Sequence, residues 1–290
     1  MRLATGASVA VAGSLIAAKL FAWFATDSVS ILSTLVDSLL DAAASVINLL
    51  AVRHALTPAD REHRFGHGKA EPLAALGQAA FIAGSASLIL FEAGHRLYQP
   101  VTISNSAVGI AVMVFSIVIT AVLVGFQHYV VRRTGSFAIR ADSLHYKGDI
   151  LVNASVIVSL VLAERLGWVQ ADPLFGGAIA VYILMSAWAI AKGALDMLMD
   201  REMPDRDRMR IRELALAHPE VRDMHDLRTR LSGPNVFIQL HLEMDGDLRL
   251  TRAHEIADQV EAKIVAAFPG AEVIIHEDPE GVDEARRDYT

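Results

Sequence analysis

The sequence contains no cysteine, which excludes disulfides and thiolate metal sites and argues against soft-metal chemistry. It also lacks an evident cleavable signal peptide, because the apolar segment from Leu3 is too long for a signal core and no convincing processing site follows it. Excess positive charge is missing too, since the formal net charge is −7. An acidic chain argues against nucleic-acid binding and is compatible with cations as partners.

Apolar residues, by contrast, are abundant and unevenly placed. They make up 53% of the 290 residues, and the mean hydropathy of +0.38 is too high for an ordinary soluble protein. Residues 1–202 carry 14 basic and 14 acidic side chains, whereas residues 203–290 carry 12 basic and 19 acidic ones, so the whole net charge lies in the second part. We therefore expect a membrane domain over 1–202 and a soluble cytoplasmic domain over 203–290.

Six apolar stretches are each near or above the roughly 20 residues that a helix needs to cross a bilayer. Basic residues gather beside one set of helix ends, and the positive-inside rule places both chain termini in the cytoplasm. These features predict an α-helical, multi-pass protein of the inner membrane. The expected transmembrane helices cover residues 3–26, 30–55, 70–98, 106–131, 141–164 and 173–199.

The tail predicts a small α+β domain in the order αββαβ. A turn signal, Ser232-Gly233-Pro234-Asn235, separates two runs with strand character. The core of so small a domain is thin, so we expect dimerisation or metal binding to support it. The expected helices cover 205–217 and 251–268, and the expected strands cover 221–231, 236–244 and 272–278.

Two pairs of metal-type ligands lie inside the apolar stretches. Asp37 and Asp41 form one pair, and His145 and Asp149 form the other; each is spaced i, i+4 and so lies on one helix face. An aspartate at the centre of a membrane helix costs about 2.5–3.5 kcal/mol on insertion scales, and such residues are usually functional. The alternative is polar contact between helices. Three carboxylates and one imidazole make a full tetrahedral set, so a membrane metal site is the sharper hypothesis.

Mixed nitrogen and oxygen ligation favours Zn²⁺, and also Cd²⁺ or Fe²⁺, over magnesium or calcium. A metal ion binds only the deprotonated forms of these side chains, so metal and protons compete for one site. If the site opens alternately to the two sides of the membrane, inward proton flow can drive outward metal flow.

A second candidate site lies between the second and third expected helices. Asp60, His63 and His67 follow the spacing D-x-x-H-x-x-x-H, which can place three ligands around one ion. The alternative is a solvated polar loop, in which Arg61 and Arg64 would compete with a cation.

A third candidate site lies in the tail. Strand alternation puts His241 and Glu243 on one face, and His276 and Asp278 share a face of the last expected strand. Scattered histidines are often plain surface residues, yet this many donors in one small domain favour a metal site. The candidate ligands are His225, His241, His254, His276 and Asp278.

Together these segments resemble the cation diffusion facilitator family, in particular its bacterial zinc and ferrous-iron exporters, along nearly the whole chain. The segments that carry the resemblance are VDSLLD (36–41), PADREHRFGHGKAE (58–71), ADSLHYKGD (141–149), HDLRTR (225–230) and IHEDP (275–279).

The resemblance implies a role for each candidate ligand. The paired ligands in the membrane would form the transport site, and histidine at position 145, where manganese-type relatives carry aspartate, would favour zinc and cadmium. The loop triad would form a second site, and the tail ligands a binuclear site with Asp278 as a bridge.

The resemblance also implies how the parts work together. Lys69 and Asp200 would form a charge pair that ties the membrane helices to the tail, and Leu144 would act as a hydrophobic gate. The protein would be a homodimer, joined through a metallochaperone-like tail, that exchanges metal for protons.

The resulting hypothesis is a metal/proton antiporter and not an enzyme. A membrane-anchored metal sensor that binds without transporting is the alternative, but a sensor would need only the tail. A metalloenzyme would need an open coordination position and a nearby base, and a channel would need weaker ligation.

Overall fold

The computed structural model describes residues 1–26, 29–99, 107–168 and 170–281. Residue 106, where one transmembrane helix is expected to begin, and the last nine residues of the expected tail domain lie outside this description. The chain divides into two compact units, Met1–Leu195 and Asp196–Thr290, which are considered in turn.

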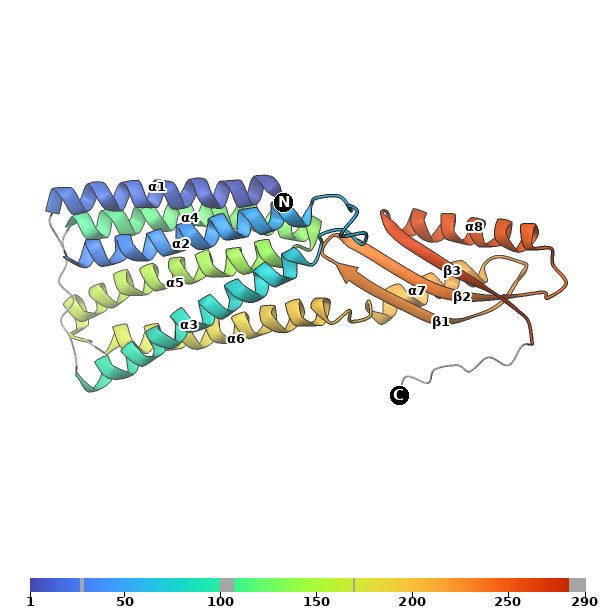
Figure 1. Cartoon of the computed structure of the whole chain (residues 1–290). Helices are drawn as coiled ribbons and strands as arrows, with labels where there is room; N and C mark the ends of the chain where they lie inside the picture. The colour runs from blue at the N-terminus through green and yellow to red at the C-terminus, as the bar shows by residue number, and fades with distance from the viewer. Residues whose placement is uncertain (27–28, 100–106, 169, 282–290) are drawn as a thin grey trace. The chain divides into compact units, whose positions relative to one another are not determined.

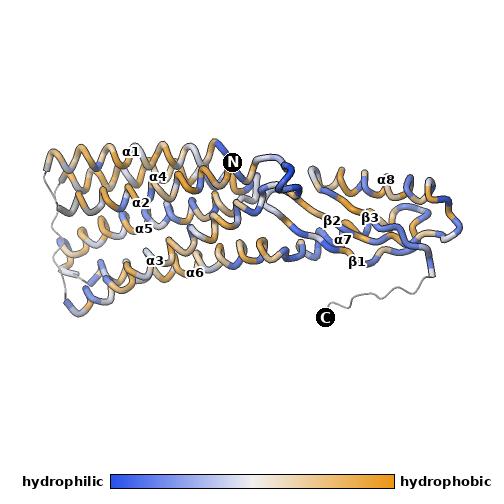
Figure 2. The backbone as a smooth tube through the Cα atoms, viewed as in Figure 1, coloured by the Kyte–Doolittle hydropathy of each residue, from blue (hydrophilic) through white to orange (hydrophobic). Residues whose placement is uncertain are grey.

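The first unit is a bundle of six long helices lying roughly side by side (Figure 1). Every helix begins and ends within four residues of its expected bounds. Apolar residues dominate these helices, with polar residues at scattered positions (Figure 2). The helices are α1 (Arg2–Thr26), α2 (Val29–Ala55), α3 (Ala70–Tyr98), α4 (Ala107–Thr134), α5 (Phe137–Leu166) and α6 (Ala171–Leu198).

Five of the helices, α1 to α4 and α6, are long and apolar enough to cross a membrane. The helical transmembrane fold is therefore confirmed. The remaining long helix, α5, packs mainly against α4 and α3 and also contacts α1 and α2. This helix carries His145 and Asp149, so both residues lie on an element that contacts four others of the bundle.

Small residues let α3, α5 and α6 approach closely around a shared core. That core includes Ala79 of α3, Leu144 of α5 and Ala187 of α6. A Cβ atom at Gly193 of α6 would lie 2.5 Å from the Phe137 ring of α5, so only glycine fits there without a shift. α5 begins four residues earlier than expected because the side chain of Ser136 caps it, accepting a hydrogen bond from the Ile139 N–H at 3.3 Å.

The second unit has the expected αββαβ order. Its sheet has the order β1-β2-β3, with β1 antiparallel to β2 and β2 parallel to β3 across the α8 connection (Figure 1). Ile238, Leu240 and Leu242 of β2 belong to a core shared with both helices, so the helices cover one sheet face. The elements are α7 (Asp205–Leu216), β1 (Val221–Ser232), β2 (Asn235–Met244), α8 (Leu250–Ala267) and β3 (Ala271–Pro279).

Strand register aligns three histidines across the other face of the sheet. His225 of β1 pairs with His241 of β2, which pairs with His276 of β3. Just after His225 the β1–β2 register shifts, and Asp226 adopts a positive φ of 46°. Such an irregularity bends a strand locally and re-aims its side chains.

Candidate metal-binding sites

Three groups of metal-type ligands occur among the described residues, one for each candidate site of the sequence. Within each group, one ligand atom per residue lies within 4.8 Å of the others. The groups are Asp41, His145 and Asp149 in the bundle, Asp60, His63 and His67 in the α2–α3 loop, and His225, His241 and Asp278 in the tail.

In the bundle, α2 and α5 bring their ligand pairs together. Nε2 of His145 lies 2.9 Å from Oδ1 of Asp41 and 3.9 Å from Oδ2 of Asp149. The His145 side chain is 10% exposed and that of Asp149 is 37% exposed, so the group is partly open. Asp37 is outside this group of described residues, and its side chain is exposed.

Sequence reasoning missed a lysine beside this site. The Lys19 ammonium of α1 donates to Oγ of Ser38 at 2.6 Å and to the Thr34 carbonyl at 3.0 Å, on the stretch of α2 that carries Asp37. The carboxylates of Asp149, Asp41 and Asp37 interact with it electrostatically. A charged residue deep in an otherwise apolar helix is the signal that could have identified it.

A buried acid, also missed, lies one helical turn before His145. Oδ2 of Asp142 accepts from Oγ of Ser8 at 2.5 Å and from Nε2 of Gln127 at 2.7 Å. Its Oδ1 accepts from Nε2 of Gln78 at 3.2 Å. These donors come from α1, α4 and α3, so one carboxylate on α5 links four helices. Asp142 is 1% exposed, and its donors replace the water that it loses on burial.

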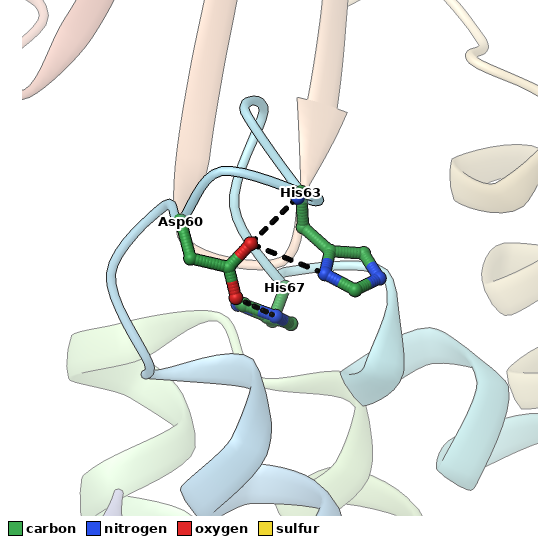
Figure 3. A group of neighbouring side chains, drawn as sticks. All are labelled: Asp60, His63 and His67. Carbon is green, nitrogen blue, oxygen red and sulfur yellow. Dashed lines mark hydrogen bonds and ion pairs between the residues drawn. The ribbon is translucent and has the colours of Figure 1, made fainter.

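The loop group is centred on a carboxylate (Figure 3). Oδ1 of Asp60 lies 3.4 Å from Nδ1 of His63, and its Oδ2 lies 3.3 Å from Nε2 of His67. His67 is buried, with 4% of its side chain exposed, whereas about half of each partner side chain is exposed. The two oxygens thus face two different imidazoles, an arrangement that can converge on one cation.

Two backbone hydrogen bonds hold the carboxylate of Asp60 in place. The N–H groups of His63 and Glu62 donate to Oδ1 at 2.6 and 2.9 Å. The hydrogen bond from His63 is the main cause that lowers the pKa of Asp60 below its usual value. The carboxylate therefore stays ionised, as a metal ligand must be.

In the tail, Asp278 is the common partner of three histidines. Its Oδ2 lies 2.8 Å from Nδ1 of His241 and 3.4 Å from Nε2 of His225, and its Oδ1 lies 3.1 Å from Nε2 of His276. Asp278 is 5% exposed, although it belongs to the last strand of a small domain. Glu243 adds a fifth group that was not predicted as a ligand: its Oε1 lies 3.2 Å from Nδ1 of His225.

His254 lies apart from the other predicted tail ligands. Its imidazole is 70% exposed and lies 3.8 Å from carboxylate oxygens of Asp258 and Glu277. Asp200, predicted to pair with Lys69, lies 3.5 Å from Arg230 within the tail unit. Because Lys69 belongs to the other unit, the predicted charge pair stays a prediction.

Comparisons with known proteins place the chain among its relatives. A cation efflux transmembrane domain model matches residues 6–199, and a model of the cytoplasmic domain of cation efflux proteins matches residues 203–280. The chain is 50% identical to the cation-efflux pump FieF of Klebsiella pneumoniae over 276 residues, which is 95% of this chain and 92% of that protein. The chain belongs to the cation diffusion facilitator family.

Two further similar proteins were found. The FieF cation-efflux pump of Salmonella newport is 50% identical over 273 residues, covering 94% of this chain and 91% of that protein. A solved structure of CzrB in a Zn form is 34% identical and covers 29% of this chain and 98% of that chain, with a TM-score of 0.28. As a member of this family, the chain is a multi-pass membrane transporter for the efflux of divalent metal cations, not an enzyme.

Proposed function

We propose that the chain exports zinc across the inner membrane in exchange for protons, with cadmium and ferrous iron as further substrates. The position of His145, with Nε2 at 2.9 Å from Asp41 and 3.9 Å from Asp149, is the observation that carries this proposal. Imidazole with carboxylates is a ligand set that suits zinc and related transition metals better than magnesium or calcium.

Asp37 supplies the fourth ligand in this proposal. It lies one turn from Asp41 on the same face of α2, so a side-chain rotation brings its carboxylate towards the group. Three carboxylates and a divalent ion leave one negative charge in the membrane, and the Lys19 ammonium on α1 offsets it. Charged groups at membrane depth are usually paired in this way.

Exchange with protons follows from competition for the same lone pairs. Zinc can bind His145 and the carboxylates only where they carry no proton, so protons that arrive from outside help to release it. Both termini and the tail face the cytoplasm in this arrangement. Leu144, which is next to His145 and buried in the α3–α5–α6 core, acts as a hydrophobic gate in this proposal.

The loop and tail sites serve regulation and assembly in the same proposal. The tail joins two copies into a homodimer, and Asp278 bridges two metal ions held with the aligned histidines. His254 binds the second ion from its place beside Glu277, which directly precedes Asp278 in β3. Lys69 and Asp200 form the charge pair between the tail and the helices.

Reconstituted vesicles test the exchange directly. Purified protein is placed in proteoliposomes with a pH-sensitive dye and a zinc-sensitive dye inside, and zinc is added outside. Zinc entry accompanied by loss of internal protons is expected, with the same zinc addition to protein-free vesicles as the control. Zinc entry that leaves the internal pH unchanged would refute proton coupling. Zinc binding without entry would refute transport and support the sensor alternative.

A further inference from the structure

A histidine outside the predicted triad packs against the loop site. His54 lies in the last turn of α2, and its imidazole meets that of His67 edge to face, with ring centroids 4.5 Å apart and the planes at 61°. His63 approaches the same ring from the loop, also with centroids 4.5 Å apart. Two imidazoles therefore pack against that of the buried His67, beside the carboxylate of Asp60.

The triad alone is one ligand short of a closed site. Asp60, His63 and His67 offer three donors, and a zinc ion in a non-catalytic site takes four in a tetrahedral arrangement. His67 faces Oδ2 of Asp60 with Nε2 at 3.3 Å, and its ring is buried, so a fourth donor to this group must come from a side chain that packs against the ring.

We propose that His54 is the fourth ligand of the loop site and completes a three-histidine, one-aspartate set for a tetrahedral transition-metal ion such as zinc. The inference rests on the proposed loop site and adds to it a residue from a different element. α2 also carries Asp37 and Asp41. An ion held by His54 therefore fixes the end of that helix to the α2–α3 loop.

Cobalt binding to the full-length protein tests this assignment. The parent protein carries Asp149→Ala, His241→Ala and Asp278→Ala, which weaken the bundle and tail sites and leave the loop as the main one. Cobalt(II) is used because its visible absorption is strong in a four-ligand tetrahedral site and weak at higher coordination numbers. Zinc affinity is then measured by displacement of cobalt.

We expect His54→Leu in this parent to weaken cobalt and zinc binding by at least about tenfold and to reduce the tetrahedral absorption band. Neither His54 nor His95 belongs to the three described ligand groups, but only His54 packs against His67. His95→Leu is therefore the matched control, because His95 is an exposed histidine in the last turn of another helix, α3. It should leave both quantities unchanged, whereas His63→Leu should reduce them as His54→Leu does.

Two results would overturn the inference, and they have different meanings. Unchanged affinity and absorption in His54→Leu would remove His54 from the site and leave the triad intact. If cobalt binding to the parent does not change with His63→Leu, the loop site is refuted together with its fourth ligand. Neither result affects zinc flux through the α2–α5 site, which the vesicle experiment measures separately.

Discussion

The two units of the molecule assemble their candidate metal ligands by different means. In the bundle, α2 and α5 each contribute two candidate ligands one helical turn apart, so two helices can supply four ligands. In the tail, His225, His241 and His276 come from three strands and meet only because those strands pair in one register. A site between helices changes whenever the helices move past one another, whereas a site on a paired sheet moves as one piece.

This difference suits the two sites to different proposed roles. Alternating access requires the ligands of the transport site to face each side of the membrane in turn, which α2 and α5 can achieve by small relative shifts. The tail ligands are held by backbone hydrogen bonds between strands and are better suited to stabilising the domain. Substitutions of the proposed ligands in the bundle should therefore abolish flux, and substitutions of the proposed ligands in the tail should mainly change stability.

The largest effect is expected for Asp149→Ala. Removal of this carboxylate takes away a proposed ligand that lies 3.9 Å from His145, so zinc export should fall to the level of cells without the protein. Intracellular zinc measured by mass spectrometry at matched expression checks this. Asp172→Ala is the control, because Asp172 pairs with Arg96 at 3.2 Å outside the cluster and should keep most of the export.

His145→Asp should change which metal is carried. A fourth carboxylate in place of the imidazole favours harder ions, so we expect preference for zinc over manganese to fall by about tenfold, equivalent to ~1.4 kcal/mol. Competition between the two metals in vesicles measures this ratio. The same replacement at His128, on α4 and outside the described ligand groups, should leave it unchanged. An unaltered preference in His145→Asp would contradict the ligand assignment.

Asp142→Ala tests whether the bundle depends on its buried carboxylate. The change leaves the amide donors of Gln78 and Gln127 without this acceptor, at about 1–3 kcal/mol for each orphaned group. The Ser8 hydroxyl can still donate to the Ala4 carbonyl, at 3.1 Å. Melting followed by tryptophan fluorescence should show a clear loss of stability. Asp142→Asn, which keeps one oxygen acceptor, should lose less, and equal melting of all three proteins would show that the network contributes little.

Asp278→Ala should show whether zinc stabilises the tail through the proposed tail site. Zinc at a hundredfold excess over its dissociation constant stabilises a binding domain by about 2.7 kcal/mol. In the full-length protein, zinc should slow hydrogen exchange in β1 to β3, and this protection should vanish in the variant. Asp247→Ala, in an exposed turn, should keep it. Protection by zinc in Asp278→Ala would mean that the ion binds elsewhere in the tail.

The smallest effect is expected for Glu220→Gln. The hydrogen bond and charge of Arg252 lower the pKa of Glu220, so the charged pair stabilises the tail above the ordinary pKa of about 4.5 and is lost as the pH falls through the lowered value. The variant should therefore be slightly less stable than the natural chain at pH 7 and equally stable in acid. Denaturant unfolding at both pH values checks this, with Glu272→Gln as an exposed control.

The sequence was most informative where the candidate ligands lie close together within one helix or loop. Helix bounds and the two i, i+4 pairs follow from periodicity within one element, as does the loop spacing of Asp60, His63 and His67. Contacts between distant elements were not predictable in this way. Lys19 meets Ser38 from another helix, and Asp142 draws its three donors from three helices. The packing of His54 on His67 likewise depends on where α2 ends relative to the loop.

In the tail, too, contacts between distant elements could not be predicted from the sequence. Strand alternation predicted which residues share a face with His241 and which share one with Asp278. The contact of His225 with these two residues, however, depends on the order and register of the strands. His254, which shares the tail with them, lies apart from their carboxylate because it belongs to α8. Sequence spacing does not reveal this difference, since donors far apart in the chain have no local pattern.

Simultaneous recording of zinc and proton flux in vesicles with the natural chain, Asp149→Ala and Asp278→Ala tests the central claim most directly. The claim is that one site between α2 and α5 carries both metal and protons. The account predicts that Asp149→Ala moves neither, and that Asp278→Ala moves both at a reduced rate with an unchanged ratio of protons to zinc. Continued exchange of zinc for protons by Asp149→Ala would contradict it.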